Sequence, residues 1–169
     1  MFQLPDGLSV RPATARDQLF LMQLFESTRQ DLQLIDQSAE ATAELMDLQF
    51  RAQTQGYGQQ FPNAMYFVIE KHREGIGKVT LDFGSNEIRL VDIALLPKAR
   101  GKGFAAAVVQ ALQLAASKVG TPMTLTVLTL NLPAKQLYAR LGFQPADLSP
   151  PYEQWIWYPP AMRSIVMAS

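Results

Sequence analysis

The succession of patterns between residues 78 and 127 is the feature that most constrains the fold. Polar and apolar residues alternate over 78–83, as in a strand with one buried face. A second strand pattern over 87–96 is followed by a helical pattern over 103–118 and a third strand pattern over 123–127. Strands joined by a helix pair in parallel, whereas strands joined by a tight turn pair antiparallel. We therefore predict a mixed sheet covered by helices, an α/β fold of the α+β mixed-sheet type.

An irregular apolar pattern marks the strand that follows the predicted hairpin. Ile88 and Leu90 share one face, whereas Val91, Ile93 and Leu95 share the opposite face. A β-bulge would absorb the slip between Leu90 and Val91, and bulges are common beside active sites. The alternative is a strand buried on both faces, in which the parity of apolar residues carries no information. The first interpretation predicts that the central strands splay apart at this point.

The remaining patterns complete what we expect to be a single domain over residues 1–169. The other expected strands are 8–11, 66–69 and 153–158, and the other expected helices are 14–29, 38–52 and 131–141. Thr14, Ser38 and Asn131 are of the types that begin helices, and Gly142 stands where a glycine commonly ends one. The expected order is therefore β-α-α-β-β-β-α-β-α-β.

Composition excludes several classes of function. Lys plus Arg and Asp plus Glu both number 15, so the formal net charge is zero, and we expect no nucleic-acid or anionic-membrane partner. The chain has no cysteine, and its one histidine, His72, falls at the predicted hairpin turn, so we expect no metal site and no thiol nucleophile. No apolar run reaches the roughly 18–20 residues of a membrane span, and the first residues lack signal-peptide character. We therefore expect a cytoplasmic protein.

The segment from Arg100 to Ala105 joins a predicted strand to a predicted helix. Gly101 and Gly103 allow a tight turn and a close approach of the backbone to a ligand. The first turn of the helix presents unpaired N–H groups with a partial positive charge, which suits a phosphate or pyrophosphate. Arg100 and Lys102 add positive charge at the rim. The alternative is an ordinary strand-to-helix turn with surface cations.

Two blocks of residues resemble the GNAT family of acetyl-CoA-dependent N-acyltransferases. That family shows an (Arg/Gln)-x-x-Gly-x-(Gly/Ala) pyrophosphate loop, followed by an Asn, an Ala three residues on, a Tyr seven residues on, and then Gly-Phe. The first block is matched by Arg100, Gly103 and Ala105, and the second by Asn131, Ala134, Tyr138, Gly142 and Phe143. The match covers 93–143, and the expected order of elements extends it over nearly the whole chain.

The resemblance implies a GNAT-like fold and a site for acetyl-CoA as the acyl donor. The backbone of Ile93, Ala94 and Leu95 would pair with the pantetheine arm as an added strand. Asn131, beside Ala134, would hydrogen-bond the same arm, although its simpler role is a helix cap. The pyrophosphate would bind at the loop, by the amides of Gly101, Lys102, Gly103, Phe104, Ala105 and Ala106 beside Arg100.

The resemblance also implies a general acid. Tyr138 would give its proton to the departing thiolate, because a tyrosine with a pKa near 10 stays protonated at neutral pH. The alternative is a tyrosine that packs in the core, since Tyr138 shares a helix face with Ala134 and Leu141. A backbone amide near Leu95 would hold the oxyanion of the tetrahedral intermediate.

The general base is where the sequence departs from the family. Some members place a glutamate on the strand before the Asn, and the matching position here is Thr126. Asp92, at the expected bulge, is our candidate base, followed by Glu87 or a water molecule held by either carboxylate. Asp92 has a structural alternative, which is to accept hydrogen bonds from the amides of the bulge.

These residues predict an N-acetyltransferase that acts by direct transfer in a ternary complex. The acceptor would be a small-molecule amine or a peptide N-terminus, with its identity and the length of the acyl group left open. The resembled family often forms dimers, so a homodimer is also expected. A non-catalytic acyl-CoA-binding or sensing module is the first alternative, and a phosphate- or nucleotide-binding domain unrelated to CoA is the second.

Overall fold

A computed structural model of the chain describes residues 2–28 and 61–163. The helix expected from Ser38 lies outside the described residues. The chain divides into two compact units. Unit 1 comprises the chain up to Thr80 together with Asp92–Lys102, and unit 2 comprises Leu81–Val91 and the chain from Gly103 onward.

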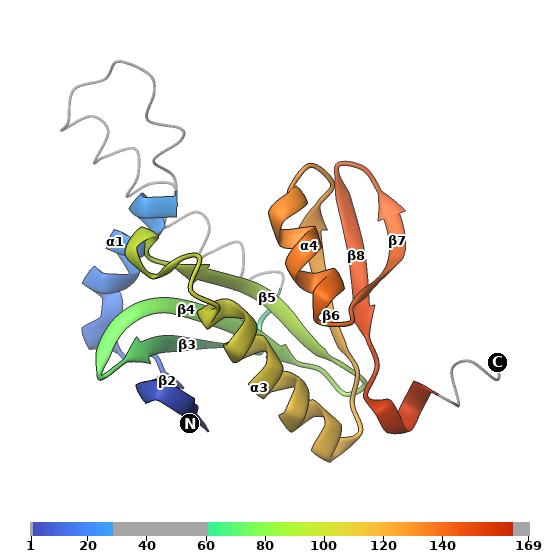
Figure 1. Cartoon of the computed structure of the whole chain (residues 1–169), viewed down its shortest axis with the longest axis horizontal. Helices are drawn as coiled ribbons and strands as arrows, with labels where there is room; N and C mark the ends of the chain where they lie inside the picture. Colours follow the sequence, from blue (N-terminus) through green and yellow to red (C-terminus); the bar gives the residue numbers. More distant parts are fainter. Residues whose placement is uncertain (1, 29–60, 164–169) are drawn as a thin grey trace. The chain divides into compact units, whose positions relative to one another are not determined.

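The described elements form a mixed sheet with helices, as predicted (Figure 1). The strands follow the order β1-β2-β3-β4-β5-β6-β8-β7 across the sheet, with β5 and β6 parallel. No helix in the described ranges is long and apolar enough to cross a bilayer. The strands are β1 (Phe2–Gln3), β2 (Leu8–Pro12), β3 (Ala64–Lys71), β4 (Glu74–Phe83), β5 (Ile88–Leu95), β6 (Met123–Leu128), β7 (Gln144–Ser149) and β8 (Tyr152–Trp157), and the helices are α1 (Gln18–Thr28), α3 (Phe104–Val119) and α4 (Leu132–Arg140).

The expected element order is incomplete at both ends of the sheet. Strand β1 precedes the first predicted strand, and β7 lies beside β8, where no strand was expected. Every residue of β7 is exposed, and its pairing with β8 shifts between Pro145 and Asp147. Because β7 has no buried face, its sequence lacks the alternation of apolar and polar residues from which strands are predicted.

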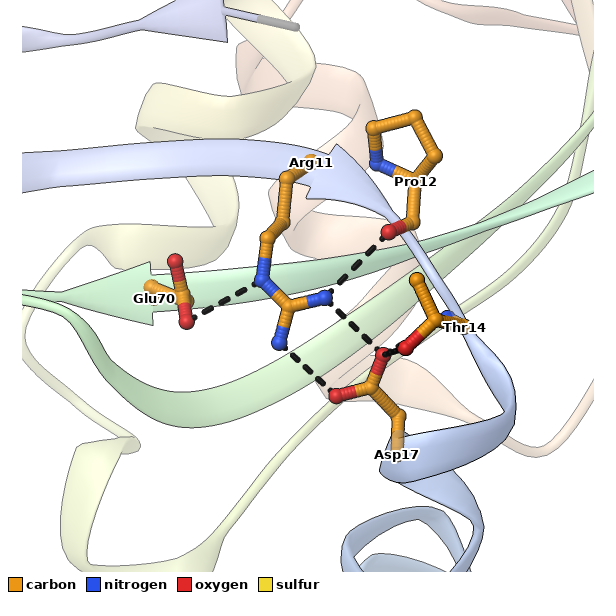
Figure 2. A network of polar contacts seen from close by, with 5 residues as sticks. All are labelled: Arg11, Pro12, Thr14, Asp17 and Glu70. Carbon is orange, nitrogen blue, oxygen red and sulfur yellow. Dashed lines mark hydrogen bonds and ion pairs between the residues drawn. The ribbon is translucent and has the colours of Figure 1, made fainter.

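An ion-pair network in unit 1 ties β2 to the start of α1 and to β3 (Figure 2). The guanidinium of Arg11 donates to both carboxylate oxygens of Asp17, at 2.7 and 2.9 Å, and lies 3.1 Å from Glu70 on β3. The same carboxylate accepts a hydrogen bond of 2.7 Å from the backbone N–H of Thr14. Thr14 therefore begins the helical segment as predicted, with a short 3-10 turn, Ala15–Asp17, before α1.

Hydrogen bonding within this network shifts both ionisation equilibria. The hydrogen bonds from Arg11, and then that from Thr14, hold the pKa of Asp17 well below its ordinary value. The carboxylates of Asp17 and Glu70 raise the pKa of Arg11. The side chain of Asp17 is only 10% exposed, so solvent screens the pair weakly.

In unit 2, strands β6 and β8 pair antiparallel. Strand β8 lies between β6 and β7 (Figure 1). Register places Met123 opposite Trp157 and Leu125 opposite Trp155, so one face of these strands is apolar and buried. Helix α3 adds a buried apolar stripe to the same unit. The stripe consists of Val108, Val109, Leu112 and Ala116.

The Arg11–Asp17 pair predicts a pH-dependent contribution to stability. Because folding lowers the pKa of Asp17, its contribution is complete above the unfolded pKa of about 4 and is lost as pH falls below that value. Asp17→Asn should therefore lower the free energy of unfolding by about 2 kcal/mol at pH 7, as for a charge-assisted hydrogen bond. Urea denaturation at pH 7 and pH 3 measures the difference.

The difference in the free energy of unfolding between wild type and Asp17→Asn should narrow at pH 3. At that pH the carboxyl of Asp17 takes up a proton in the unfolded chain but stays ionised in the folded one. Asp147→Asn, on the exposed strand β7, is the matched control and should change stability little at either pH. An equal gap at both pH values would show that the ionised state of Asp17 does not stabilise the fold.

Candidate functional site

A cavity of about 240 Å³ opens in unit 1 beside the part of β5 predicted to bind pantetheine. Asp92, Ile93 and Ala94 contribute one wall from β5, and Lys78 reaches the cavity from β4. The Nζ of Lys78 lies 3.1 Å from Oδ2 of Asp92, and the two side chains are only 13% and 24% exposed. The remaining wall comes from α1, through Leu24, Phe25 and Thr28.

Lys78 is a site residue that the sequence analysis missed. The alternation over 78–83 placed it on the polar face of its strand, which is ordinarily the solvated face. The sequence pointed to Asp92 as a site residue but gave it no partner, because the residue that faces it from a neighbouring strand depends on the register between the strands. Lys78 is largely buried, so its ammonium is weakly hydrated and needs a carboxylate partner, which Asp92 supplies.

The backbone of β5 comes unusually close to β4 at Gly77. A Cβ at position 77 would overlap the carbonyl oxygen of Ala94 and lie 2.6 Å from Cδ2 of Leu95. The N–H of Leu96 donates to the carbonyl of Ile76 at 2.8 Å, which holds the two strands together beside this contact. Glycine at 77 is therefore needed for the path that β5 takes through Ala94 and Leu95.

The predicted change of course in β5 coincides with the end of its ladder with β6. Ile88, Arg89 and Leu90 pair with Met123, Thr124 and Leu125, and the ladder ends at Leu90, where the apolar pattern slips. The β-bulge and the splay themselves remain predictions. Glu87, the second candidate base, lies in the turn before β5, where its carbonyl accepts a hydrogen bond of 3.0 Å from Gly84.

The glycine-containing loop has the backbone conformation that its glycines allow. Gly101 and Gly103 adopt φ angles of 72° and 83°, and a Cβ on either would meet open space. The Nε of Arg100 donates to the carbonyl of Leu95 at 3.1 Å, so this side chain turns back toward β5. The first helical hydrogen bond of α3 runs from Ala107 to Gly103 at 3.0 Å.

The amides of Ala105 and Ala106 precede this first helical hydrogen bond and have no acceptor within the helix. They belong to the N-terminal turn of α3. Gly101, Lys102 and Gly103, which lead into this turn, are all exposed. Open space above both glycines, small side chains and N-terminal amides together suit a diphosphate group.

In unit 2, Asn131 and Tyr138 lie on α4. Oδ1 of Asn131 accepts a hydrogen bond of 3.3 Å from the N–H of Ala134, so Asn131 is the N-terminal cap of the helix. Tyr138 is only 9% exposed, and its ring meets that of Phe143 edge to face, with centroids 5.7 Å apart. Tyr138 therefore packs in the core of unit 2, and its role as an acid remains a prediction.

Helix α4 is fixed on its sheet by polar contacts at both ends. Lys135 donates to Glu153 of β8 at 2.9 Å, and the indole N–H of Trp155 donates to the same carboxylate at 3.0 Å. These hydrogen bonds lower the pKa of Glu153, the one from Lys135 having the larger effect. Gln113 of α3 donates to the carbonyl of Leu141 at 2.8 Å. The helix that carries Tyr138 is thereby held at two points.

Thr126, which stands at the position of the family glutamate, contacts Gln154 and Arg89. Its hydroxyl donates to Gln154 at 2.9 Å and accepts a hydrogen bond from Arg89. Among the described residues, no group of three or more His, Cys, Asp or Glu side chains could hold a metal ion. The structure thus brings Asp92, Ile93 and Ala94 together in unit 1 with Lys78, while Asn131 and Tyr138 belong to unit 2.

Residues 62–145 match the family model described as "Acetyltransferase (GNAT) domain". No curated protein matched the sequence significantly.

Many solved structures share the fold. One is the PaiA N-acetyltransferase from Thermoplasma acidophilum, solved in complex with coenzyme A. Its sequence is 16% identical and the TM-score is 0.67, and the aligned region covers 89% of this chain and 98% of the PaiA chain. The ribosomal-protein-S18-alanine N-acetyltransferase from Escherichia coli is 15% identical, with a TM-score of 0.64 and coverages of 89% and 93%. The spermidine N-acetyltransferase SpeG chimera from Vibrio cholerae and hSSAT is 20% identical, with a TM-score of 0.62 and coverages of 90% and 95%.

The contact between Gly77 and Ala94 predicts a steric effect of substitution. Gly77→Ala should lower the free energy of unfolding by about 1–3 kcal/mol, because the added methyl group meets backbone that cannot move independently. Chemical denaturation measures the loss.

Gly75→Ala on the same strand is the matched control. Its Cβ would approach only the ring of Phe20, at 3.2 Å, and that side chain can shift. The control should therefore lose less stability than Gly77→Ala. Equal losses would show that the path of β5 does not depend on glycine at 77.

Proposed function

Because this chain belongs to the GNAT acetyltransferase family, we propose that it transfers the acetyl group of acetyl-CoA directly to a primary amine. The loop at the start of α3 is the observation that carries this proposal. Its two glycines have positive φ angles with open space beside them, and they lead into helix amides that lack intrahelical acceptors. Such a loop can bind a diphosphate through backbone N–H groups alone. The coenzyme A complex of the PaiA neighbour supports this choice of ligand.

The donor would extend from this loop along β5. The amides of residues 101–106 would hold the pyrophosphate, and Arg100 and Lys102 would supply positive charge. The backbone of Ile93, Ala94 and Leu95 would pair with the pantetheine arm as an added strand. Asn131, whose Oδ1 caps α4 beside Ala134, retains Nδ2 as a donor for a carbonyl of that arm.

The acceptor amine must lose a proton before it can attack. A protonated alkyl amine has a pKa near 10.4, so at neutral pH only a small fraction is nucleophilic. Asp92 borders the cavity at the end of the predicted pantetheine strand, and we assign it the role of general base. Lys78 balances the negative charge of Asp92 within the cavity.

The chemical step follows from these assignments. Asp92 accepts one proton from the ammonium, the nitrogen attacks the thioester carbonyl, and a C–N bond forms. The amide of Leu95 would hold the oxyanion, and collapse of the tetrahedral intermediate breaks the C–S bond. Tyr138 gives its proton to the thiolate, and the nitrogen loses its second proton, which passes through solvent to the phenolate of Tyr138. Asp92 releases its proton to solvent. Direct transfer suits a chain without cysteine, since no thiol can carry an acyl-enzyme.

The class of acceptor is an amine, either a small molecule or a peptide N-terminus. Two structural neighbours are named as N-acetyltransferases of a ribosomal-protein alanine and of spermidine. These acceptors differ in charge and size, so they support amine acetylation without choosing among amines. The alternative function is a module that binds acyl-CoA and does not turn it over.

Removal of one hydroxyl separates the enzyme from the sensing module. Tyr138→Phe should lower kcat about 100-fold, as expected when a general acid is removed, and should leave the Kd for acetyl-CoA unchanged. The ring and its packing on Phe143 are retained. Release of free thiol with a panel of amines measures turnover, and calorimetry measures binding.

Tyr152→Phe is the control, since Tyr152 is 51% exposed on β8, and its kcat should equal that of wild type. An unchanged kcat in Tyr138→Phe would contradict the role of Tyr138. Tight acetyl-CoA binding without thiol release for any amine would favour the sensing module.

A further inference from the structure

The cavity in unit 1 carries one positive and one negative side chain next to each other on its described walls. Among the described residues that line it, Lys78 on β4 and Asp92 on β5 are the titratable groups. Helix α1 contributes Leu24, Phe25 and Thr28, and β5 adds Ile93 and Ala94. The two charged side chains are thus neutral as a pair.

The charge arrangement discriminates between classes of amine. A polyamine or other purely cationic acceptor would have to share Asp92 with the ammonium of Lys78, which lies 3.1 Å from the carboxylate. Both side chains are largely shielded from solvent, so the repulsion between two cations is weakly screened. A zwitterion avoids this conflict, because its ammonium can face Asp92 while its carboxylate faces Lys78.

Size and walls restrict the acceptor further. About 240 Å³ lies below the range of about 300–1,000 Å³ typical of sites for drug-sized ligands. Ile93 and Ala94 of β5, which are partly exposed, provide apolar surface beside the ion pair. An acceptor with a single apolar side chain would fill this space and shield the charges.

We propose that the acceptor is a free α-amino acid with an apolar side chain, and that Lys78 is the residue that selects it by binding its carboxylate. This inference rests on the proposed function and deepens it. The α-ammonium lies at Asp92, next to Ile93 and Ala94, where the acetyl end of the donor is placed. The reaction then yields an N-acetyl amino acid and coenzyme A. The nitrogen loses one proton to Asp92 and a second one, through solvent, to the phenolate that remains after Tyr138 has protonated the thiolate.

The test compares L-leucine with L-leucinamide, which keeps the amine and side chain but lacks the carboxylate. The ratio of their kcat/KM values should fall about 10- to 100-fold in Lys78→Met, as expected for loss of one charge-assisted hydrogen bond. Comparing ratios between variants cancels the different intrinsic reactivity of the two amines. Lys78→Arg keeps the charge and should retain most of the ratio.

Lys98→Met is the matched control. Lys98 also pairs with a carboxylate, that of Glu74 at 2.6 Å, but it is 62% exposed and does not line the cavity. Its removal should leave the leucine-to-leucinamide ratio at the wild-type value. Spermidine is the cationic reference acceptor, and wild type should prefer L-leucine to it.

A binding measurement makes the test independent of turnover and of the folding of Lys78→Met. In the presence of coenzyme A, calorimetry of the wild type should show L-leucine binding at least 10-fold more tightly than L-leucinamide. Equal affinities, an unchanged ratio in Lys78→Met, or a preference for spermidine would each overturn the inference. Failure of the proposed function is distinct, since it would appear as no acetyl-CoA binding or no thiol release with any of the three amines.

Discussion

The carbonyl oxygen of Ala94 occupies the space that a side chain at position 77 would need. This one steric constraint determines how β5 passes β4, and several parts of the site follow from it. Asp92 and Ile93, just before the contact, border the cavity with Lys78. Leu95, just after it, accepts a hydrogen bond from Arg100 at the start of the glycine loop. Strand β5 thus connects the cavity to the glycine loop along the chain.

Three ion pairs that are largely shielded from solvent have different surroundings, and we assign them different roles. Arg11 with Asp17 joins a strand to a helix start, and Lys135 with Glu153 joins α4 to β8. In both, further hydrogen bonds from backbone or indole N–H groups satisfy the carboxylate. The pair of Lys78 and Asp92 instead borders a cavity. Charges that face a cavity can exchange partners with a ligand, which is why we assign function to this pair and structure to the other two.

Local chemistry made much of the architecture predictable. The hairpin around His72, the helix after Gly103 and the cap at Asn131 all depend on residues close in sequence, and the structure has each of them. Gly142, expected at the end of α4, has the positive φ that only glycine adopts readily. Strand β7 was missed because it is exposed along its whole length, so pairing rather than burial holds it.

The site was predictable where it depends on backbone and less so where it depends on pairing between strands. The glycine loop could be located from its spacing, because positive φ angles at Gly101 and Gly103 are a local property. The partnership of Lys78 with Asp92 and the need for Gly77 both depend on the register of β4 against β5. A pattern of apolar residues leaves that register open by one or more positions, and each shift changes which side chains meet.

The central claim is that β5 and the loop after it bind acetyl-CoA through their backbone amides. Hydrogen exchange followed residue by residue, with and without acetyl-CoA, tests this claim directly because it reports on the amides themselves. We predict slower exchange at residues 93–95 and 101–106 with acetyl-CoA and no such change with ATP or NAD. Protection confined to other segments, or equal protection by ATP or NAD, would contradict the account.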